Sequence, residues 1–371
     1  MVLVANSAWL VAGWWRDYKN RCSAGWGKSV TKVFVGMSGG VDSSLAAALL
    51  VEQGYDVIGV YMKNWSQDLP GMKCPWAEDL ADAKRVAVKL GIDFRVFDFE
   101  REYRDQVVQY MIDEYKLGHT PNPDIMCNQE VKFKLFLDAS LDQGADMIAT
   151  GHYAKTSDGN LLKATDENKD QTYFLYRVTK EALEKTLFPL GDMTKQQVRK
   201  EAAARSLVTA GKKESMGVCF VGQVGMKEFL GQYVETQPGD IVDKQSGDKI
   251  GRHDGAIFYT LGQRHGLDLG GGLPYYVVGK DMERNEVYVS RNINDDNIWR
   301  QTIELQNIHW IDESSERPRD VQVRIRHRAA LVDAVIEGNT LTLADKQRAI
   351  TSGQSAVIYS GNKCLGGGVV V

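Results

Sequence analysis

The sequence predicts an α/β protein, with an N-terminal domain on a parallel sheet, a small central domain and a C-terminal β-barrel. First, short apolar runs alternate with segments of helical period as far as residue 150. Second, a glycine-rich turn directly follows the first apolar run. Third, after residue 222 short apolar or alternating runs are separated by Gly, Asp and Asn turns, which favours an all-β arrangement.

The N-terminal strands are expected at short apolar runs, which suit a parallel sheet covered on both faces. These runs are residues 33–36, 55–62, 93–99 and 146–150. Helices are expected at residues 46–51, 79–90, 101–116 and 130–141. Because strands and helices alternate, we expect helices on both faces of the sheet.

The remaining chain divides by composition. Residues 1–30 form an atypical extension, 31–222 the α/β domain, 223–290 the small central domain and 291–371 the C-terminal β-barrel. The last part contains VQVRIRH, LVDAVIEGNTLTLA and QSAVIYSGNKCLGGGVVV, in which EGNT is a plausible hairpin turn. A β-sandwich is the alternative architecture for this part.

The amino-acid composition limits the classes of protein to which this chain can belong. Hydrophobic residues make up 43% and charged residues 25% of the 371 residues, as in soluble globular proteins. The net charge of −4 does not indicate a nucleic-acid partner, so RNA would need a local basic surface. No apolar run reaches about 18 residues, so no membrane span is predicted. Five scattered cysteines without metal-ligand spacing favour a reducing, cytoplasmic setting and predict no metal centre.

The first 30 residues contain four tryptophans and several basic residues. The basic residues follow the short apolar run instead of preceding it, which is the wrong order for a secretory signal. We expect either a loosely docked extension or a start codon assigned too early, with a transit peptide as a weaker alternative.

The sequence MSGGVDSS lies between an expected strand and an expected helix. Glycines let backbone N–H groups approach a phosphate, and the helix N-terminus adds partial positive charge. Ser38 and Ser43 can donate hydroxyl hydrogen bonds, whereas Asp42 is expected to hold the loop or to meet Mg²⁺. The alternative is a structural turn with Ser and Asp caps. The motif resembles the loop of the ATP pyrophosphatase superfamily, which forms AMP and pyrophosphate, and whose amide and amidine ligases use the same loop.

Two cysteines lie in sequence contexts that fit either a reactive thiol or a buried, unreactive one. Cys127 follows a Pro-rich loop just before an expected helix, where the helix dipole can stabilise a thiolate. Cys219 lies between glycines, downstream of Lys212 and Lys213. Either thiol can instead be a small buried hydrophobe, since Phe220 and Val221 adjoin Cys219.

Motifs along nearly the whole chain resemble the tRNA-specific 2-thiouridylase family. They are GMSGGVDSS, YMKNW, TPNPDIMCNQEVKF, ATGHYA, NKDQTYFLY, SMGVCFVG, TLGQRHGL, YYVVGKD and GQSAVIY. The resemblance implies an adenine nucleotide alpha hydrolase-like catalytic domain and a central domain that contacts tRNA. It implies ATP-dependent thiolation of C2 of the wobble uridine, position 34, in tRNAs for Lys, Glu and Gln.

The resemblance also implies roles for individual residues. The ATP site would comprise Gly36, Met37, Ser38, Gly39, Gly40, Val41, Asp42, Ser43, Met62 and Gly151. The target base would face Asn122, Pro123 and Asp124, with Asp124 as acid or base, Cys127 as nucleophile and Cys219 as persulfide carrier. Contacts to tRNA would come from Lys169, Asp170, Gln171, Arg326 and His327.

This chain departs from the family pattern at three places. Arg326–His327 stands where Arg-Tyr is usual, Met216 stands where Thr is usual, and residues 1–30 have no counterpart. From residue alternation alone, Arg324, Arg326 and Arg328 would lie on one face of a strand, as a phosphate-contacting surface or a solvated face. His152 is either a nucleotide contact or a structural histidine.

The implied chemistry needs ATP, Mg²⁺, the anticodon stem-loop of tRNA and a persulfide-donating relay protein or cysteine desulfurase. The persulfide attacks C2 directly, or Cys127 releases sulfide from it and leaves a Cys127–Cys219 disulfide.

An amide ligase such as argininosuccinate synthetase is a rival function for this chain, and it needs no cysteine. A nucleotide sensor or RNA-binding module without catalysis is a second rival. An iron–sulfur enzyme is a third, but CxxC pairs are absent.

Overall fold

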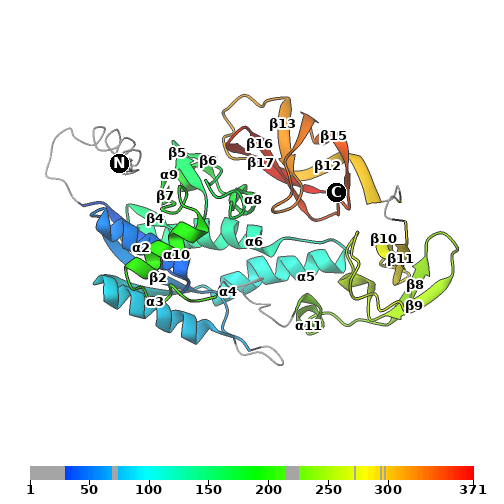
Figure 1. The fold of residues 1–371 in the computed structure, drawn as a ribbon, viewed down its shortest axis with the longest axis horizontal. Helices are drawn as coiled ribbons and strands as arrows, with labels where there is room; N and C mark the ends of the chain where they lie inside the picture. Colours follow the sequence, from blue (N-terminus) through cyan, green and yellow to red (C-terminus); the bar gives the residue numbers. More distant parts are fainter. Residues whose placement is uncertain (1–29, 69–73, 214–224, 271–272, 293–294, 296–297) are drawn as a thin grey trace, which may run out of the picture.

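A computed structural model describes residues 30–68, 74–213, 225–270, 273–292, 295 and 298–371. Residues 1–29 of the expected extension (1–30) and the segment with Cys219 and Met216 lie outside the described residues. Figure 1 shows an α/β domain, a β-barrel beside it and a small β-rich domain that the helix α5 (Gln109–Lys116) approaches.

The α/β domain is built on a five-stranded, fully parallel sheet in the order β3-β2-β1-β4-β7. Its strands are β1 (Lys32–Gly36), β2 (Asp56–Lys63), β3 (Asp93–Asp98), β4 (Met147–Ala149) and β7 (Thr186–Leu187). Four of them match the strands expected from apolar runs. The expected α/β class is confirmed, because the sheet is parallel and covered on both faces.

Alternating residues of β1 face two separate hydrophobic clusters. Val33 and Val35 pack in the cluster that contains residues of α2 (Val41–Glu52), α3 (Trp76–Leu90) and α10 (Lys195–Ala204). Phe34 packs on the opposite face, in the cluster that also contains Phe133, Phe136 and Leu175. This alternation is the period of two that a strand imposes on its side chains.

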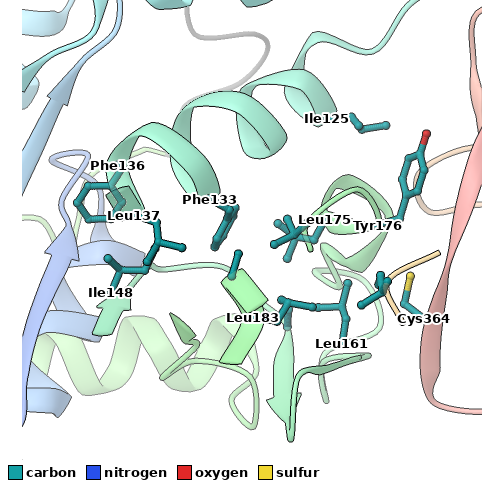
Figure 2. Packing of buried hydrophobic residues seen from close by; sticks show 14 of the residues in the cluster. Ile125, Phe133, Phe136, Leu137, Ile148, Leu161, Leu175, Tyr176, Leu183 and Cys364 are labelled. Carbon is teal, nitrogen blue, oxygen red and sulfur yellow. The ribbon is translucent and has the colours of Figure 1, made fainter. Parts of the chain in front are cut away.

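Two long helices of the second face contain π-helical segments. One comprises α4 (Glu100–Tyr103), η2 (Arg104–Val108) and α5 (Gln109–Lys116). The other comprises α6 (Pro123–Met126), η3 (Cys127–Leu135) and α7 (Phe136–Asp142). The short helices α8 (Thr172–Leu175) and α9 (Lys180–Glu184) complete this side. Figure 2 shows how Phe133 and Leu175 meet in the cluster, with Tyr176 and Cys364 at the barrel side.

The central domain has a four-stranded mixed sheet in the order β10-β11-β8-β9. Its elements are α11 (Met226–Leu230), β8 (Gly239–Asp243), β9 (Lys249–His253), η4 (Ala256–Phe258), β10 (Tyr276–Asp281) and β11 (Glu286–Ser290). Its own core includes Ile241, Val277 and Val287. It meets the α/β domain where Thr120 Oγ1 lies 3.4 Å from Thr260 Oγ1.

The C-terminal domain is a closed barrel, as expected, and not a sandwich. Its strands are β12 (Trp299–Trp310), β13 (Asp320–Arg324), β14 (Val332–Glu337), β15 (Thr340–Arg348), β16 (Ser355–Ser360) and β17 (Lys363–Val370). Pairing of β12 with β17 closes the six strands. The expected EGNT hairpin joins β14 to β15, with Glu337 paired to Thr340.

A hairpin of the α/β domain extends the barrel sheet. It consists of β5 (Lys155–Ser157) and β6 (Asn160–Leu162), and β6 pairs with β17. The α/β domain and the barrel therefore share a continuous sheet and the hydrophobic cluster of Figure 2. This shared packing fixes one domain against the other.

Candidate active site

The glycine-rich loop connects β1 to α2 and is held by hydroxyl contacts. The Ser38 N–H donates to Ser43 Oγ at 3.1 Å, and Ser44 Oγ donates to the Gly40 carbonyl at 2.7 Å. Gly40 is the N-cap of α2 and supplies no side-chain cap. The first N–H groups of this helix are therefore left for a ligand, and such groups bind phosphate readily.

Close packing around the loop explains two of its glycines. A Cβ on Gly39, whose φ is +72°, would lie 2.3 Å from the Asp79 carbonyl oxygen. A Cβ on Gly151 would lie 2.6 Å from the Ser43 nitrogen. Met62 also reaches the loop, because its Cε lies 3.0 Å from the Cβ position of Gly36. The structure thus brings together the sequence-predicted loop, Met62 and Gly151.

Asp42 holds the loop instead of facing an open metal position. Both carboxylate oxygens accept from Lys195 Nζ at 2.7 Å, and Tyr153 Oη donates to Asp42 Oδ1 at 2.9 Å. Of the two roles left open by the sequence, the structure supports the structural one. A magnesium ion here would be held mainly through ATP phosphates and water, as is usual for this ion.

Tyr153 connects the nucleotide loop to the segment expected to contact tRNA. Its N–H donates to Gln171 Oε1 at 2.8 Å, and the Gln171 N–H donates to the Tyr153 carbonyl at 2.9 Å. Sequence reasoning missed Tyr153 and Lys195. Tyr153 stands in the ATGHYA motif, whereas Lys195 is 153 positions from its partner and had no local signal.

The helix that contains Cys127 starts earlier than expected. It begins at Pro123 instead of residue 130, because the Asn122 side chain accepts from the Asp124 N–H at 3.1 Å and proline occupies the first turn. Cys127 therefore lies inside the helix, at the start of its π-helical part. The expected position of this thiol just before a helix N-terminus was wrong.

Cys127 is buried in an apolar cluster, with 3% of its surface exposed. Its cluster includes Val131 together with Phe229 and Leu230 of α11. Cys219 belongs to a segment outside the described residues, but α11 follows that segment directly. The helix that follows the Cys219 segment in the sequence thus packs in the cluster around Cys127.

Asp124 and Lys132 lie on the same helix as Cys127, and His152, which follows β4, contacts Lys132. Burial raises the pKa of Asp124 above its ordinary value, and the positive charge of Lys132 opposes that rise. Lys132 Nζ lies 3.4 Å from His152 Nε2, and Thr150 Oγ1 lies 2.8 Å from His152 Nδ1. Burial, with Lys132 adding to it, lowers the pKa of His152 far below 6.5, so this ring is neutral at pH 7.

The two segments expected to contact tRNA meet at the junction of α8 and the barrel. The ring of His327 lies 4.4 Å from that of Phe174, centroid to centroid. Tyr173 Oη contacts the Ile325 carbonyl at 3.3 Å, and Arg328 Nε donates to the Asn168 carbonyl at 3.2 Å. Residues 168–174 and 325–328 therefore pack against one another.

Two sequence expectations about this region need correction. Strand β13 ends at Arg324, and Arg328 has a φ of +65°, so the three arginines do not share a strand face. Arg324 is buried and donates to Asp170 Oδ2 at 3.0 Å. The Asp170 side chain, 2% exposed, faces the barrel, so its carboxylate does not reach RNA in this arrangement. Contacts of Lys169, Gln171, Arg326 and His327 with tRNA stay predictions.

Comparison with known proteins assigns the family. Models described as the tRNA methyl transferase HUP domain, the tRNA methyl transferase PRC-barrel domain and the aminomethyltransferase beta-barrel domain match residues 31–223, 227–291 and 300–370. The tRNA-specific 2-thiouridylase MnmA of Bacillus subtilis is 46% identical over 92% of this chain and 95% of its own length. The chain belongs to the MnmA family. The MnmA of Geobacillus thermodenitrificans is 45% identical over 92% of this chain and 94% of its own length.

Similarity to solved structures is lower. A 4-thiouridine synthetase–RNA complex with bound ATP matches with a TM-score of 0.37 and 16% identity, over 55% of this chain and 50% of that chain. The MnmA assignment therefore rests on the sequence relatives.

Within the described ranges, no helix has the length and hydropathy needed to cross a membrane. The division of this MnmA chain at residues 222 and 290 stays a prediction.

The Asp170–Arg324 pair gives a stability prediction for this MnmA-family chain. Arg324→Met is expected to destabilise the protein by about 3 kcal/mol, because it leaves a buried carboxylate without its cation. The matched control is Arg319→Met on the same strand region, where an exposed pair with Glu337 is worth less than about 1 kcal/mol. Denaturant unfolding of both variants measures the difference, and equal losses would contradict the buried-pair account.

A second prediction concerns the pH dependence of stability. Burial, followed by Arg328 and Arg324, lowers the pKa of His327 from 6.5 to about 4. Between these values the unfolded chain binds a proton that the folded chain does not, so stability falls as pH drops from 6.5 toward 4. His327→Phe retains an aromatic ring and should lose less stability between pH 7 and pH 5 than the wild type. An identical loss in both proteins, measured by denaturant unfolding, would contradict the prediction.

Proposed function

We propose that this chain catalyses ATP-dependent 2-thiolation of the wobble uridine, position 34, in tRNAs for Lys, Glu and Gln. One observation carries the proposal: the chain is 46% identical over 92% of its length to a curated 2-thiouridylase. The geometry supports the proposal. Tyr153 connects Asp42, next to the glycine-rich loop, to Gln171 at the start of α8. Lys132 contacts His152 and acts electrostatically on Asp124, one turn before Cys127.

In this proposal, ATP binds with its phosphates on the N-terminus of α2. The loop N–H groups and the hydroxyls of Ser38 and Ser43 receive the pyrophosphate, while Lys195 neutralises the nearby Asp42 carboxylate. Met62 lies at the start of the loop, beside Gly36. A magnesium ion held by the ATP phosphates would supply positive charge that offsets the leaving pyrophosphate.

Adenylation of the C2 oxygen activates C2 of uridine for nucleophilic attack. The C2 oxygen bonds to the α-phosphorus of ATP, the bond from that phosphorus to the bridging oxygen breaks, and pyrophosphate leaves. The N3 proton of uridine is lost in the same process. Asp124 is proposed to accept it, because burial raises the pKa of this carboxyl and so makes it a stronger base.

Sulfur then replaces the adenylated oxygen. The terminal sulfur of a Cys219 persulfide attacks C2, and AMP leaves with the original oxygen. Cys127 thiolate attacks the Cys219 sulfur, which frees 2-thiouridine and leaves a Cys127–Cys219 disulfide. In the second route Cys127 attacks the persulfide first and releases sulfide, which attacks C2. Both routes leave the same disulfide, which a cellular thiol must reduce.

Both routes require movement of the Cys127 region. The thiol is 3% exposed, and a disulfide needs the two sulfurs at about 2 Å. Since α11 packs in the Cys127 cluster and follows the Cys219 segment, we propose that α11 shifts when tRNA binds. The uridine must also leave the anticodon stack to reach the site.

The proposed partners follow from this chemistry. Arg326 and His327, with Lys169 and Gln171, would contact the anticodon stem-loop, where a neutral His327 can stack on a base. A relay protein or cysteine desulfurase would supply the persulfide. The cysteine content and the need to reduce the disulfide favour a cytoplasmic setting.

Nucleoside mass spectrometry tests the proposal. Purified protein is incubated with ATP, Mg²⁺, a persulfide donor and tRNA for Lys, and with the same tRNA having cytidine at position 34. We expect 2-thiouridine in the first tRNA only. AMP release with an amino-acid acceptor and no thiolated tRNA would instead assign the chain to the amide ligases that share the loop.

A further inference from the structure

Among the described residues, Lys132 forms no salt bridge, although it lies beside the proposed reaction centre. Within the described ranges, no carboxylate oxygen lies within 4.0 Å of its ammonium. Its hydrogen-bond contact is His152 Nε2 at 3.4 Å. Because an ammonium only donates, Nε2 accepts, and the proton of the neutral ring is on Nδ1 and points to Thr150 Oγ1. A partly buried ammonium whose hydrogen-bond contact is a neutral acceptor can also bind an anionic ligand.

The position of His152 is fixed next to the nucleotide loop. It follows Gly151, which packs against the Ser43 nitrogen. The rings of Phe133 and Phe188 enclose the imidazole, with centroids 5.7 Å and 6.1 Å away. Lys132 is thereby held at the edge of the loop, at the end of β4.

The same ammonium also acts on the turn expected to face the target base. Its positive charge affects the pKa of Asp124, which is one turn before Cys127. In the π-helical segment from Cys127 to Leu135, residue i bonds to residue i+5, so Lys132 lies one turn after Cys127. Lys132 therefore contacts His152, the neighbour of the loop-packed Gly151, and also lies one helical turn from Cys127.

We propose that Lys132 is a further catalytic residue whose ammonium binds the α-phosphate of ATP and of the adenylated uridine. This inference rests on the proposed function, in which the C2 oxygen bonds to the α-phosphorus. That phosphorus must then lie between the pyrophosphate on the loop and the base at the turn. The ammonium neutralises the non-bridging α-phosphate oxygens as the bond to pyrophosphate breaks.

Binding of AMP and adenosine tests the inference directly, because only AMP carries the α-phosphate. Isothermal titration compares the wild type with Lys132→Met. We expect AMP affinity to fall at least about tenfold and adenosine affinity to stay unchanged, as for loss of one charge-assisted hydrogen bond. Lys132→Arg should retain part of the preference for AMP. Equal weakening of both ligands, or weakening of neither, would overturn the assignment.

The matched control is Lys134→Met, two residues further along the same helix. Lys134 is exposed and already pairs with Glu130 Oε2 at 2.7 Å, so its loss should leave both affinities unchanged. In turnover, tRNA-dependent AMP formation by Lys132→Met should fall about a hundredfold, with a smaller change in KM for ATP. If the wild type forms no 2-thiouridine, the proposed function fails, whereas the AMP and adenosine affinities still decide the role of Lys132.

Discussion

Cys127→Ser is expected to abolish thiolation, with at least about a thousandfold loss of 2-thiouridine formation, while ATP binding stays unchanged. A serine hydroxyl can neither break the persulfide nor form the disulfide that completes sulfur transfer. The loop, Met62 and Gly151 do not include this thiol, so nucleotide binding should persist. Nucleoside mass spectrometry and ATP titration of the same preparation measure the two effects.

Two further variants separate chemistry from folding. Cys127→Ala avoids placing a hydroxyl in the apolar cluster and should be equally inactive. Cys74→Ser is the matched control, because this half-buried thiol donates to the Trp65 carbonyl at 3.7 Å and has no role in the proposed transfer. Thiolation that survives in both Cys127 variants would remove this cysteine from the mechanism.

Gly39→Ala is expected to abolish ATP-dependent AMP formation, although it adds only one methyl group. The new Cβ would lie 2.3 Å from the Asp79 backbone oxygen, and the residue would have to keep a φ of +72°. Neither the carbonyl of α3 nor the left-handed backbone can yield without moving the loop from the N-terminus of α2. We expect ATP affinity to fall more than about tenfold, with strain of roughly 1–3 kcal/mol in the folded protein.

Gly40→Ala provides the neighbouring control. Gly40 has a φ of −94°, and among the described residues a Cβ there would meet only Ser38 Oγ, at 3.4 Å. This variant should unfold at the wild-type denaturant concentration, whereas Gly39→Ala should unfold at a lower one. Equal stability and equal ATP affinity for Gly39→Ala and wild type would show that the loop does not depend on this backbone conformation.

Parts of the fold could be predicted where one local signal decides the structure. The parallel strands are short apolar runs that can only be buried, and the EGNT turn determined the β14–β15 hairpin. The start of the Cys127 helix was missed because Asn122, Pro123 and Asp124 also suit a turn. Only the structure shows that they form an N-cap and first turn.

Long-range contacts account for what the sequence could not indicate. The β5–β6 hairpin joins β17, about half the chain away, and no local pattern marks that pairing. Arg324 was expected on a phosphate-contacting or solvated strand face because every second residue there is an arginine, yet Asp170 pairs with it inside the structure. The loop and Gly151 were identified from motifs, whereas Lys195 and Lys132 acquire their roles only through partners distant in the sequence.

The most direct test of the central claim follows the oxygen that sulfur replaces. A tRNA with oxygen-18 at O2 of uridine 34 is incubated with the protein, ATP, Mg²⁺ and a persulfide donor, and the released AMP is analysed by mass spectrometry. If ATP activates uridine by adenylating that oxygen, each thiolated tRNA yields one AMP that contains the label. Thiolated tRNA accompanied by unlabelled AMP would contradict adenylation of the C2 oxygen.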